Sequence, residues 1–277
     1  MQCAASRSHE IQQQQHKPGH FFAGNTVVIR NMIMKTLAFV IPVYNESARI
    51  AKTLQALKQG ISSTGLKLEE IIFVNDGSTD NTGSLISDIR VQLEQITGAK
   101  VTLLSYDENR GKGYAIRLGM QAATSDYILF FDADMSTPLE ELNKFAPFIE
   151  KNIDVVIGTR KNGHSTVIKH QPFHRELLGK GFTLLSNVIL NTWVTDFTCG
   201  FKAFSREAKD RVFSVSTIDR WGYDAEILHI AQKKGLTMKE VAVQWANDDR
   251  TKVNLLKDIP QTLADLMKIR FTHLRAN

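Results

Sequence analysis

The stretch Tyr127-Ile-Leu-Phe-Phe-Asp-Ala-Asp-Met135 decides the fold. Its first five residues are apolar and predict a buried strand, and Asp132 and Asp134 follow directly. In open α/β sheets, ligands bind in the crevice beyond the carboxyl ends of the strands. Two carboxylates at such a place predict a clip for Mg²⁺ or Mn²⁺ with a diphosphate, because hard cations prefer carboxylate and phosphate oxygens. A solvated acidic turn would have the same sequence, so the other segments must decide.

Short apolar runs alternate with amphipathic stretches over residues 35–160. Besides the strand that ends at Asp132, strands are predicted at 35–43, 71–74, 101–104 and 154–157. Apolar residues three or four apart predict helices over about 50–57, 85–96, 112–123 and 139–151. This alternation predicts an α/β fold with a mostly parallel sheet flanked by helices.

The pattern changes after residue 160. Residues 161–174 are polar and basic without a clear period and predict a loop or lid. Further helices are predicted over 178–193, over 223–234 and after Pro260, and a strand is predicted within 236–245. We expect one domain over 34–277, with 161–277 as a C-terminal elaboration. Residues 1–33 are polar, with a glutamine run, and are expected to be a disordered extension outside the fold.

Composition narrows the class of protein. The net charge of the 277 residues is +5, which permits attraction to phosphates or to an anionic membrane. No nucleic-acid motif or basic block is present, so nucleic acid is not an expected partner. Cys3 and Cys199 lie far apart and fit a reducing cytosol rather than a disulfide framework or a zinc site. No apolar stretch reaches the ~18 residues of a membrane-spanning helix, and no secretory signal is predicted.

Two further strands end in polar groups. The first predicted strand leads into Tyr44, which offers a flat face to a base, and Glu46, which can accept hydrogen bonds. The second leads into Asp76, followed by Gly77, which permits a tight turn. Each segment by itself could be an ordinary capping turn. Because three strands deliver acidic groups to one carboxyl edge, the sequence favours a binding crevice over solvated turns.

These residues fall into ordered motifs that match a known family. The set resembles the family-2 inverting glycosyltransferases of the GT-A fold, in the segments 40–46, 75–80, 109–113 and 132–134. Later segments resemble the branch that transfers sugar to dolichyl or other polyprenyl phosphates: 158–160, 196–202, 220–226 and 245–253. The similarity is greatest to dolichyl-phosphate glucosyltransferases and covers about 36–270. Eukaryotic members of that branch carry an N-terminal membrane helix, which is not predicted here.

The resemblance implies roles for the donor-side residues. The nucleoside would be held by Pro42, Tyr44, Glu46, Val74 and Asp76. Asp132 and Ala133 would contact ribose and diphosphate, and Asp134 would bind the metal ion. Related enzymes often use a third metal ligand two residues further on, which here is Ser136, a weak neutral ligand. The implied halves are a nucleotide-sugar-binding half, 34–160, and an acceptor-side half, 161–277.

The resemblance also implies roles for later charged residues. Arg160 and Lys252 would act in catalysis with Asp134 by neutralising the diphosphate and the acceptor phosphate, unless they are solvated charges. Lys112 either faces phosphate or is a surface lysine. The acceptor side would be formed by Arg220, Asp224 and Glu226. A structural ion pair on one helix turn is the alternative for the last two.

The expected reaction is metal-dependent transfer of glucose from UDP-glucose to a dolichyl-type polyprenyl phosphate, with inversion to a β-linked product. A phosphate monoester is largely dianionic at neutral pH, with a second pKa of about 6, so it needs no strong general base. Two alternatives are a GDP-mannose-dependent polyprenyl-phosphate mannosyltransferase and a catalytically silent nucleotide-sugar-binding module.

Two apolar stripes flanked by basic residues, 178–193 and the segment after Pro260, would suit helices lying on a membrane. Packing in the core is the alternative for both. We therefore expect a cytoplasmic protein that is peripheral at the cytoplasmic membrane face.

Overall fold

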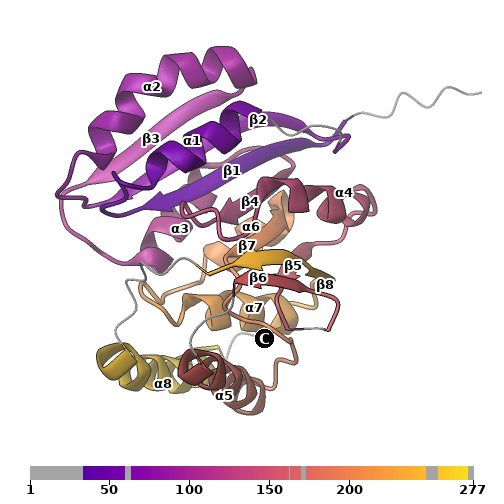
Figure 1. Ribbon diagram of the computed structural model, residues 1–277. Coiled ribbons are helices and arrows are strands. Elements are labelled where there is room, and N and C mark those ends of the chain that lie inside the picture. The colour runs from indigo at the N-terminus through magenta and orange to yellow at the C-terminus, as the bar shows by residue number, and fades with distance from the viewer. Residues whose placement is uncertain (1–33, 60–63, 162, 170–172, 248–254, 274–277) are drawn as a thin grey trace, which may run out of the picture. The chain divides into compact units, whose positions relative to one another are not determined.

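The computed structural model describes residues 34–59, 64–161, 163–169, 173–247 and 255–273, all within one compact unit, Met34–Asn277. Its main sheet has the strand order β3-β2-β1-β4-β7-β5-β8 (Figure 1). These strands are β1 (Thr36–Val43), β2 (Lys67–Asp76), β3 (Lys100–Tyr106), β4 (Tyr127–Phe131), β5 (Val155–Thr159), β7 (Phe201–Ser205) and β8 (Met238–Ala242). All neighbouring strands are parallel except β7, which is antiparallel to β4 and β5. Both predicted halves contribute strands to this sheet.

Helices cover both faces of the sheet. They are α1 (Ile50–Gln59), α2 (Thr82–Thr97), α3 (Lys112–Ala122), α4 (Leu142–Glu150), α5 (Phe173–Leu190), α6 (Arg206–Phe213), α7 (Tyr223–Lys233) and α8 (Leu255–Thr272), with a short 3₁₀ turn, η1 (Leu139–Glu141), before α4. Figure 1 shows α5 and α8 side by side at the end of the molecule farthest from α2.

The alternation of side chains along β1 explains the two layers of the core. Phe39 and Ile41 point to the face covered by α1, α2 and α4. Ala38 and Val40 point to the opposite face, where α3, α6, α7 and α8 pack. Because successive residues of a strand face opposite sides, a strand that is apolar throughout needs cover on both sides. The predicted strands and helices of residues 35–160 are thus confirmed as a mostly parallel α/β sheet.

Three parts of the C-terminal half differ from the sequence prediction. Residues 161–174 are not a plain loop, because they contain β6 (Thr166–Lys169), which pairs in parallel with β9 (Gln244–Ala246). Strand β7 and helix α6 were not predicted; Lys202, the second residue of β7, disguises a buried strand. Helix α8 begins before Pro260 rather than after it. Packing of Leu266 and Ile269 in the core offsets the hydrogen bond that the proline lacks.

Candidate active site at the carboxyl edge of the sheet

The two carboxylates after β4 lie in a tight turn at the edge of the sheet. Strand β4 pairs with β1 as far as Phe130, and the chain then turns, with Met135 N donating to Asp132 O at 3.1 Å. The backbone N–H of Ser136 donates to Asp134 Oδ1 at 2.8 Å and orients that side chain. Thr53 of α1 donates to the carbonyl of Ala133 and anchors the turn. The sequence therefore places Asp132 and Asp134 where α/β sheets bind ligands.

Asp132 belongs to a row of side chains whose charges alternate in sign: Asp132, Lys112, Asp224 and Lys202. Lys112 Nζ, at the start of α3, lies 2.5 Å from Asp132 Oδ1 and above the rings of Trp221 and Tyr223 at 6.0 Å. Burial alone would lower the pKa of Lys112, but the charges of Asp132 and Asp224 raise it. Lys112 is therefore held as a cation inside the site and is not a solvated surface lysine.

The surroundings of Asp134 fit a divalent cation. Burial and the neighbouring charge of Asp132 raise the pKa of Asp134, so the fold holds two like charges together at a cost. In the described part of the chain, no group of three or more His, Cys, Asp or Glu side chains is arranged so that it could hold a metal ion. Mg²⁺ is commonly bound by one or two carboxylates plus substrate phosphates, so the donor chemistry of Asp132 and Asp134, with Ser136 as a neutral neighbour, fits such an ion.

Asp76 is the centre of the second loop at this edge. Its carboxylate accepts hydrogen bonds from Tyr106 Oη at 2.9 Å, Asn109 Nδ2 at 2.9 Å, and the backbone N–H groups of Arg110 and Gly111 at 2.8 and 3.0 Å. Burial nevertheless raises its pKa, because desolvation exceeds the stabilisation by these donors. Asp76 thus organises the loop that follows β3 in addition to lying at the strand end.

Gly77 permits the close approach of that loop. Its φ is +65°, and a Cβ there would lie 2.6 Å from the backbone N of Asn109. We expect Gly77→Ala to lower the free energy of unfolding by more than about 2 kcal/mol, because left-handed strain adds to a backbone clash. Gly98→Ala is the matched control, since φ is +69° there but nothing lies within 4 Å of the added Cβ. Urea unfolding should show a loss of about 1 kcal/mol for that control; equal losses would contradict the clash.

The loop after β1 is bound to the loop after β2. Glu46 N donates to Thr82 Oγ1 at 2.8 Å, and Asn45 Oδ1 accepts from Thr79 N at 2.8 Å. The carboxylate of Glu46 meets Arg49 Nε and Nη2 at 2.5 and 2.7 Å. Glu46 therefore lies beside the Asp76 loop, in a bidentate pair that the sequence analysis did not foresee.

The other predicted nucleoside residues occupy adjacent positions. Pro42 is paired with Val74 in the register of β1 and β2, and Tyr44 follows at the strand end. The side chain of Val74 is fully buried on the α3 side, so only its backbone remains for a ligand. The structure thus brings the residues after β1, β2 and β4 to one edge.

Arg160, directly after β5, is held by a buried partner. Its Nε and Nη2 donate to the two carboxylate oxygens of Asp196 at 2.7 and 2.9 Å, and its guanidinium carbon lies 5.1 Å from the centre of the Trp245 ring. Asp196 is 0% exposed and also lies 3.6 Å from Lys161 Nζ. Arg160 is therefore fixed in place, within electrostatic range of Asp132, rather than a mobile solvated charge.

The predicted acceptor-side residues separate into different environments. Asp224 Oδ1 lies 2.5 Å from Lys202 Nζ, and this buried pair extends the row of charges from Lys112. Arg220 is exposed and within electrostatic range of Asp76. The ion pair on one helix turn that was considered for Asp224 is thus made instead with a residue of β7.

Glu226 is occupied by the protein itself. Its carboxylate is 0% exposed and accepts from Thr217 N, Ile218 N and His273 Nε2 at 2.9, 2.8 and 3.0 Å. Glu226 therefore joins α7 to the end of α8, and its carboxylate oxygens are used within the protein. Lys252 lies outside the described residues.

Three structural partners of the site were missed by the sequence analysis: Asp196, Lys161 and Lys202. Asp196 and Lys202 stand at the two ends of the segment Asp-Phe-Thr-Cys-Gly-Phe-Lys, which was assigned no site role. The sequence did contain a signal for these two residues, since each is a charged residue at one end of a segment that is otherwise uncharged.

Residues 38–213 match Glycosyl transferase family 2. The chain belongs to that family. The glycosyltransferase chain is 34% identical over 247 residues to the dolichyl-phosphate beta-glucosyltransferase of Dictyostelium discoideum, a match that covers 86% of this chain and 75% of that protein. It is 32% identical over 255 residues to the enzyme of the same name from Homo sapiens, over 87% and 76% of the two proteins.

A solved structure confirms the fold of the glycosyltransferase. The crystal structure of glucosyl-3-phosphoglycerate synthase from Mycobacterium tuberculosis, in complex with Mn²⁺, UDP and glucosyl-3-phosphoglycerate, is similar with a TM-score of 0.58 and 21% identity, over 86% of this chain and 80% of that one. The prediction of a GT-A α/β fold is therefore confirmed.

Proposed function

We propose that this family-2 glycosyltransferase transfers glucose from UDP-glucose to a dolichyl-type polyprenyl phosphate and inverts the anomeric carbon. The observation that carries the proposal is the Asp132–Asp134 pair at the carboxyl end of β4, beside Lys112 and within range of Arg160. The dolichyl-phosphate beta-glucosyltransferases that resemble most of the chain support this acceptor and sugar.

The arrangement supports catalysis by positioning and charge. The lipid phosphate oxygen would attack the anomeric carbon while the bond from that carbon to the β-phosphate oxygen of UDP breaks. Lys112 and Arg160 would stabilise the charge on the departing diphosphate, and Asp132 and Asp134 would hold Mg²⁺ or Mn²⁺, which supplies Lewis-acid stabilisation of that charge. The residues after β1 and β2 would hold the nucleoside.

The acceptor side is proposed for the residues at the start of α7. Asp224 would hold Lys112 in place through electrostatic attraction, and Arg220 would lie near the incoming phosphate. Glu226 would act only by positioning α7, since its oxygens are already used. Lys252 keeps its proposed role at the diphosphate.

A product assay tests the donor and the acceptor together. Labelled UDP-glucose and GDP-mannose are each incubated with a short polyprenyl phosphate and Mn²⁺, and lipid-soluble label is counted. We expect product from UDP-glucose, and a rise in melting temperature with UDP that GDP does not match. Product from GDP-mannose alone would establish the mannosyltransferase instead. UDP-glucose binding without turnover would establish a silent binding module.

We also propose attachment to the surface of the cytoplasmic membrane. No described helix is both long and apolar enough to cross a bilayer. Exposed apolar side chains gather on the adjacent helices α5 and α8 and just beyond α5: Leu177, Leu178, Leu184, Leu185, Val188, Trp193, Leu263, Met267 and Phe271. Such a face suits the headgroup region of a membrane that carries the lipid acceptor. Flotation with phosphatidylcholine vesicles should carry the protein upward, and protein remaining at the bottom would contradict attachment.

A further inference from the structure

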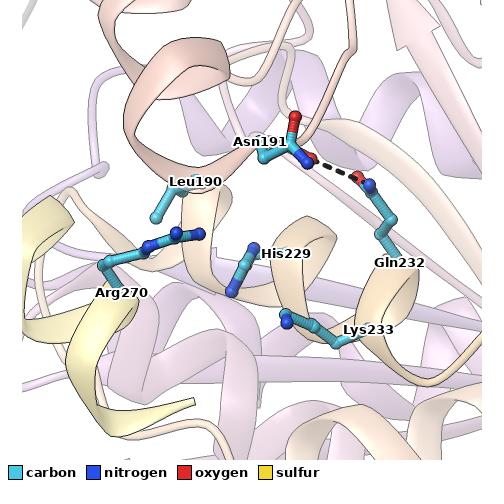
Figure 2. Close-up of a pocket in the computed structure, with 6 residues that line it drawn as sticks. All are labelled: Leu190, Asn191, His229, Gln232, Lys233 and Arg270. Atoms are coloured by element: carbon cyan, nitrogen blue, oxygen red, sulfur yellow. Dashed lines mark hydrogen bonds between the residues drawn. The ribbon is translucent and has the colours of Figure 1, made fainter. Parts of the chain in front are cut away.

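A pocket of about 210 Å³ lies where the C-terminal ends of α5, α7 and α8 meet (Figure 2). It is lined by Leu190, Asn191, His229, Gln232, Lys233 and Arg270. Gln232 Nε2 donates to the backbone oxygen of Asn191 at 2.8 Å and closes one wall. Asp224 lies in the first turn of α7 and Lys233 ends the helix, so the helix rise of ~1.5 Å per residue separates this pocket from the carboxyl edge by about 14 Å.

Two cations in this pocket have no partner among the residues that the structure describes. Lys233 and Arg270 lie in the last turns of α7 and α8, where basic residues complement the negative end of the helix dipole. Neither forms a hydrogen bond or an ion pair with any residue that the structure describes. Arg270 is partly buried, and a partly buried guanidinium is stabilised by an anionic acceptor, which none of the described residues supplies.

The histidine between these cations adds a second observation. His229 is 2% exposed, and Figure 2 shows its ring between the side chains of Arg270 and Lys233. One ring nitrogen, Nδ1, lies 3.0 Å from Thr192 Oγ1, while Nε2 is buried without a hydrogen-bond partner among the described residues. Burial, followed by the charges of His273, Lys233 and Arg270, lowers the pKa of His229 to about 4. The ring is therefore neutral at pH 7 and lies in a region of positive potential.

Exposed apolar and aromatic side chains lie close in sequence to the residues that line the pocket. Trp193 is 67% exposed, and its Nε1 donates to Asn191 Oδ1 at 3.1 Å. Phe271, adjacent to Arg270 in sequence, is 62% exposed, and Val188 is exposed on the last turns of α5. Exposed tryptophan and phenylalanine beside basic residues are typical of protein surfaces at the boundary between lipid headgroups and acyl chains.

We propose that this pocket binds the phosphate of an anionic membrane lipid, with Arg270 and Lys233 as the charged ligands and the apolar faces of α5 and α8 against the bilayer. The guanidinium group offers paired donors that match phosphate oxygens. The inference rests on the proposed attachment to the membrane and adds to it a headgroup site separate from the active site. Inorganic phosphate has the same chemistry, so the test must distinguish the two sources.

The test compares vesicle binding of the full chain with that of the double variant R270Q/K233Q. Vesicles of phosphatidylcholine alone and of phosphatidylcholine with phosphatidic acid are titrated and sedimented. We expect the double variant to lose about 25-fold in affinity for the acidic vesicles, because each basic residue near an anionic surface contributes about fivefold. Binding to phosphatidylcholine alone should stay unchanged, since it depends on the apolar face.

The matched control is R90Q/K58Q, which removes the same charge from exposed positions on α2 and α1. It should bind acidic vesicles within about twofold of the unmodified protein. An equal loss in both double variants, or no preference for phosphatidic acid in the unmodified protein, would overturn the proposal. One further result would overturn the proposal: the unmodified protein does not bind acidic vesicles, but inorganic phosphate raises its melting temperature and R270Q/K233Q abolishes that rise.

Transfer to a short, detergent-dispersed polyprenyl phosphate reports on the proposed function independently. R270Q/K233Q should retain that activity, because neither residue lies at the carboxyl edge. Failure of the headgroup site and failure of the glucosyl transfer are thereby distinguishable.

Discussion

Asp134→Asn is expected to reduce sugar transfer by about a thousandfold while leaving the ligand-free protein at least as stable as before. Asparagine keeps the shape of the side chain but is a weak neutral ligand, so the metal-bound diphosphate loses several kcal/mol of charge stabilisation, at ~1.4 kcal/mol per tenfold. In the ligand-free protein, burial and Asp132 raise the pKa of Asp134, so the ionised carboxylate is disfavoured by the fold. Removing it relieves that cost.

Two measurements separate these effects. Initial rates with UDP-glucose and Mn²⁺ give the loss in activity, and thermal unfolding without ligands gives the change in stability. Asp88→Asn on the exposed surface of α2 is the control with the same chemical change, and both quantities should remain at their original values. If Asp134→Asn retained full activity, the metal assignment would be wrong. A large drop in the melting temperature would show that Asp134 is structural.

The carboxyl-edge arrangement was predictable because it depends on local sequence. Strand β4 and the turn after it are contiguous, so one apolar run placed both Asp132 and Asp134. The strand–helix alternation then indicated that the strands are mostly parallel, since parallel neighbours need crossover connections such as helices. The approximate positions of Glu46 and Asp76 followed from the same reasoning.

The residues that hold the site together were not predictable in the same way. Asp196 meets Arg160 only because β7 inserts antiparallel between β4 and β5, and no local period indicates that insertion. Lys202 is 0% exposed in β7, which contradicts the usual preference of lysine for water until its pairing with Asp224 is known. Contacts between residues from distant segments can be predicted only after the order and direction of the strands are known.

Asp196→Ala is expected to lower the free energy of unfolding by about 3–5 kcal/mol, because removing one member of a buried ion pair leaves the other charge uncompensated. Asp196 is 0% exposed and binds Arg160 through both oxygens, with Lys161 nearby. Urea unfolding at pH 7 measures the loss. Glu207→Gln is the control, because its pair with Arg211 is exposed at 3.6 Å and should contribute less than about 1 kcal/mol. Equal losses would contradict the importance of burial.

The pH dependence tests the same pair by another route. Burial would raise the pKa of Asp196, but the charges and hydrogen bonds of Arg160, with Lys161, hold it well below its usual range. A carboxylate with a depressed folded-state pKa stabilises the protein above its unfolded pKa of about 3.9 and loses that contribution as the pH falls through the folded value. The stability difference between the unmodified protein and Asp196→Ala should therefore be constant from pH 8 to about pH 5 and narrow below about pH 4. A difference independent of pH throughout would mean that packing, rather than charge, makes Asp196 necessary.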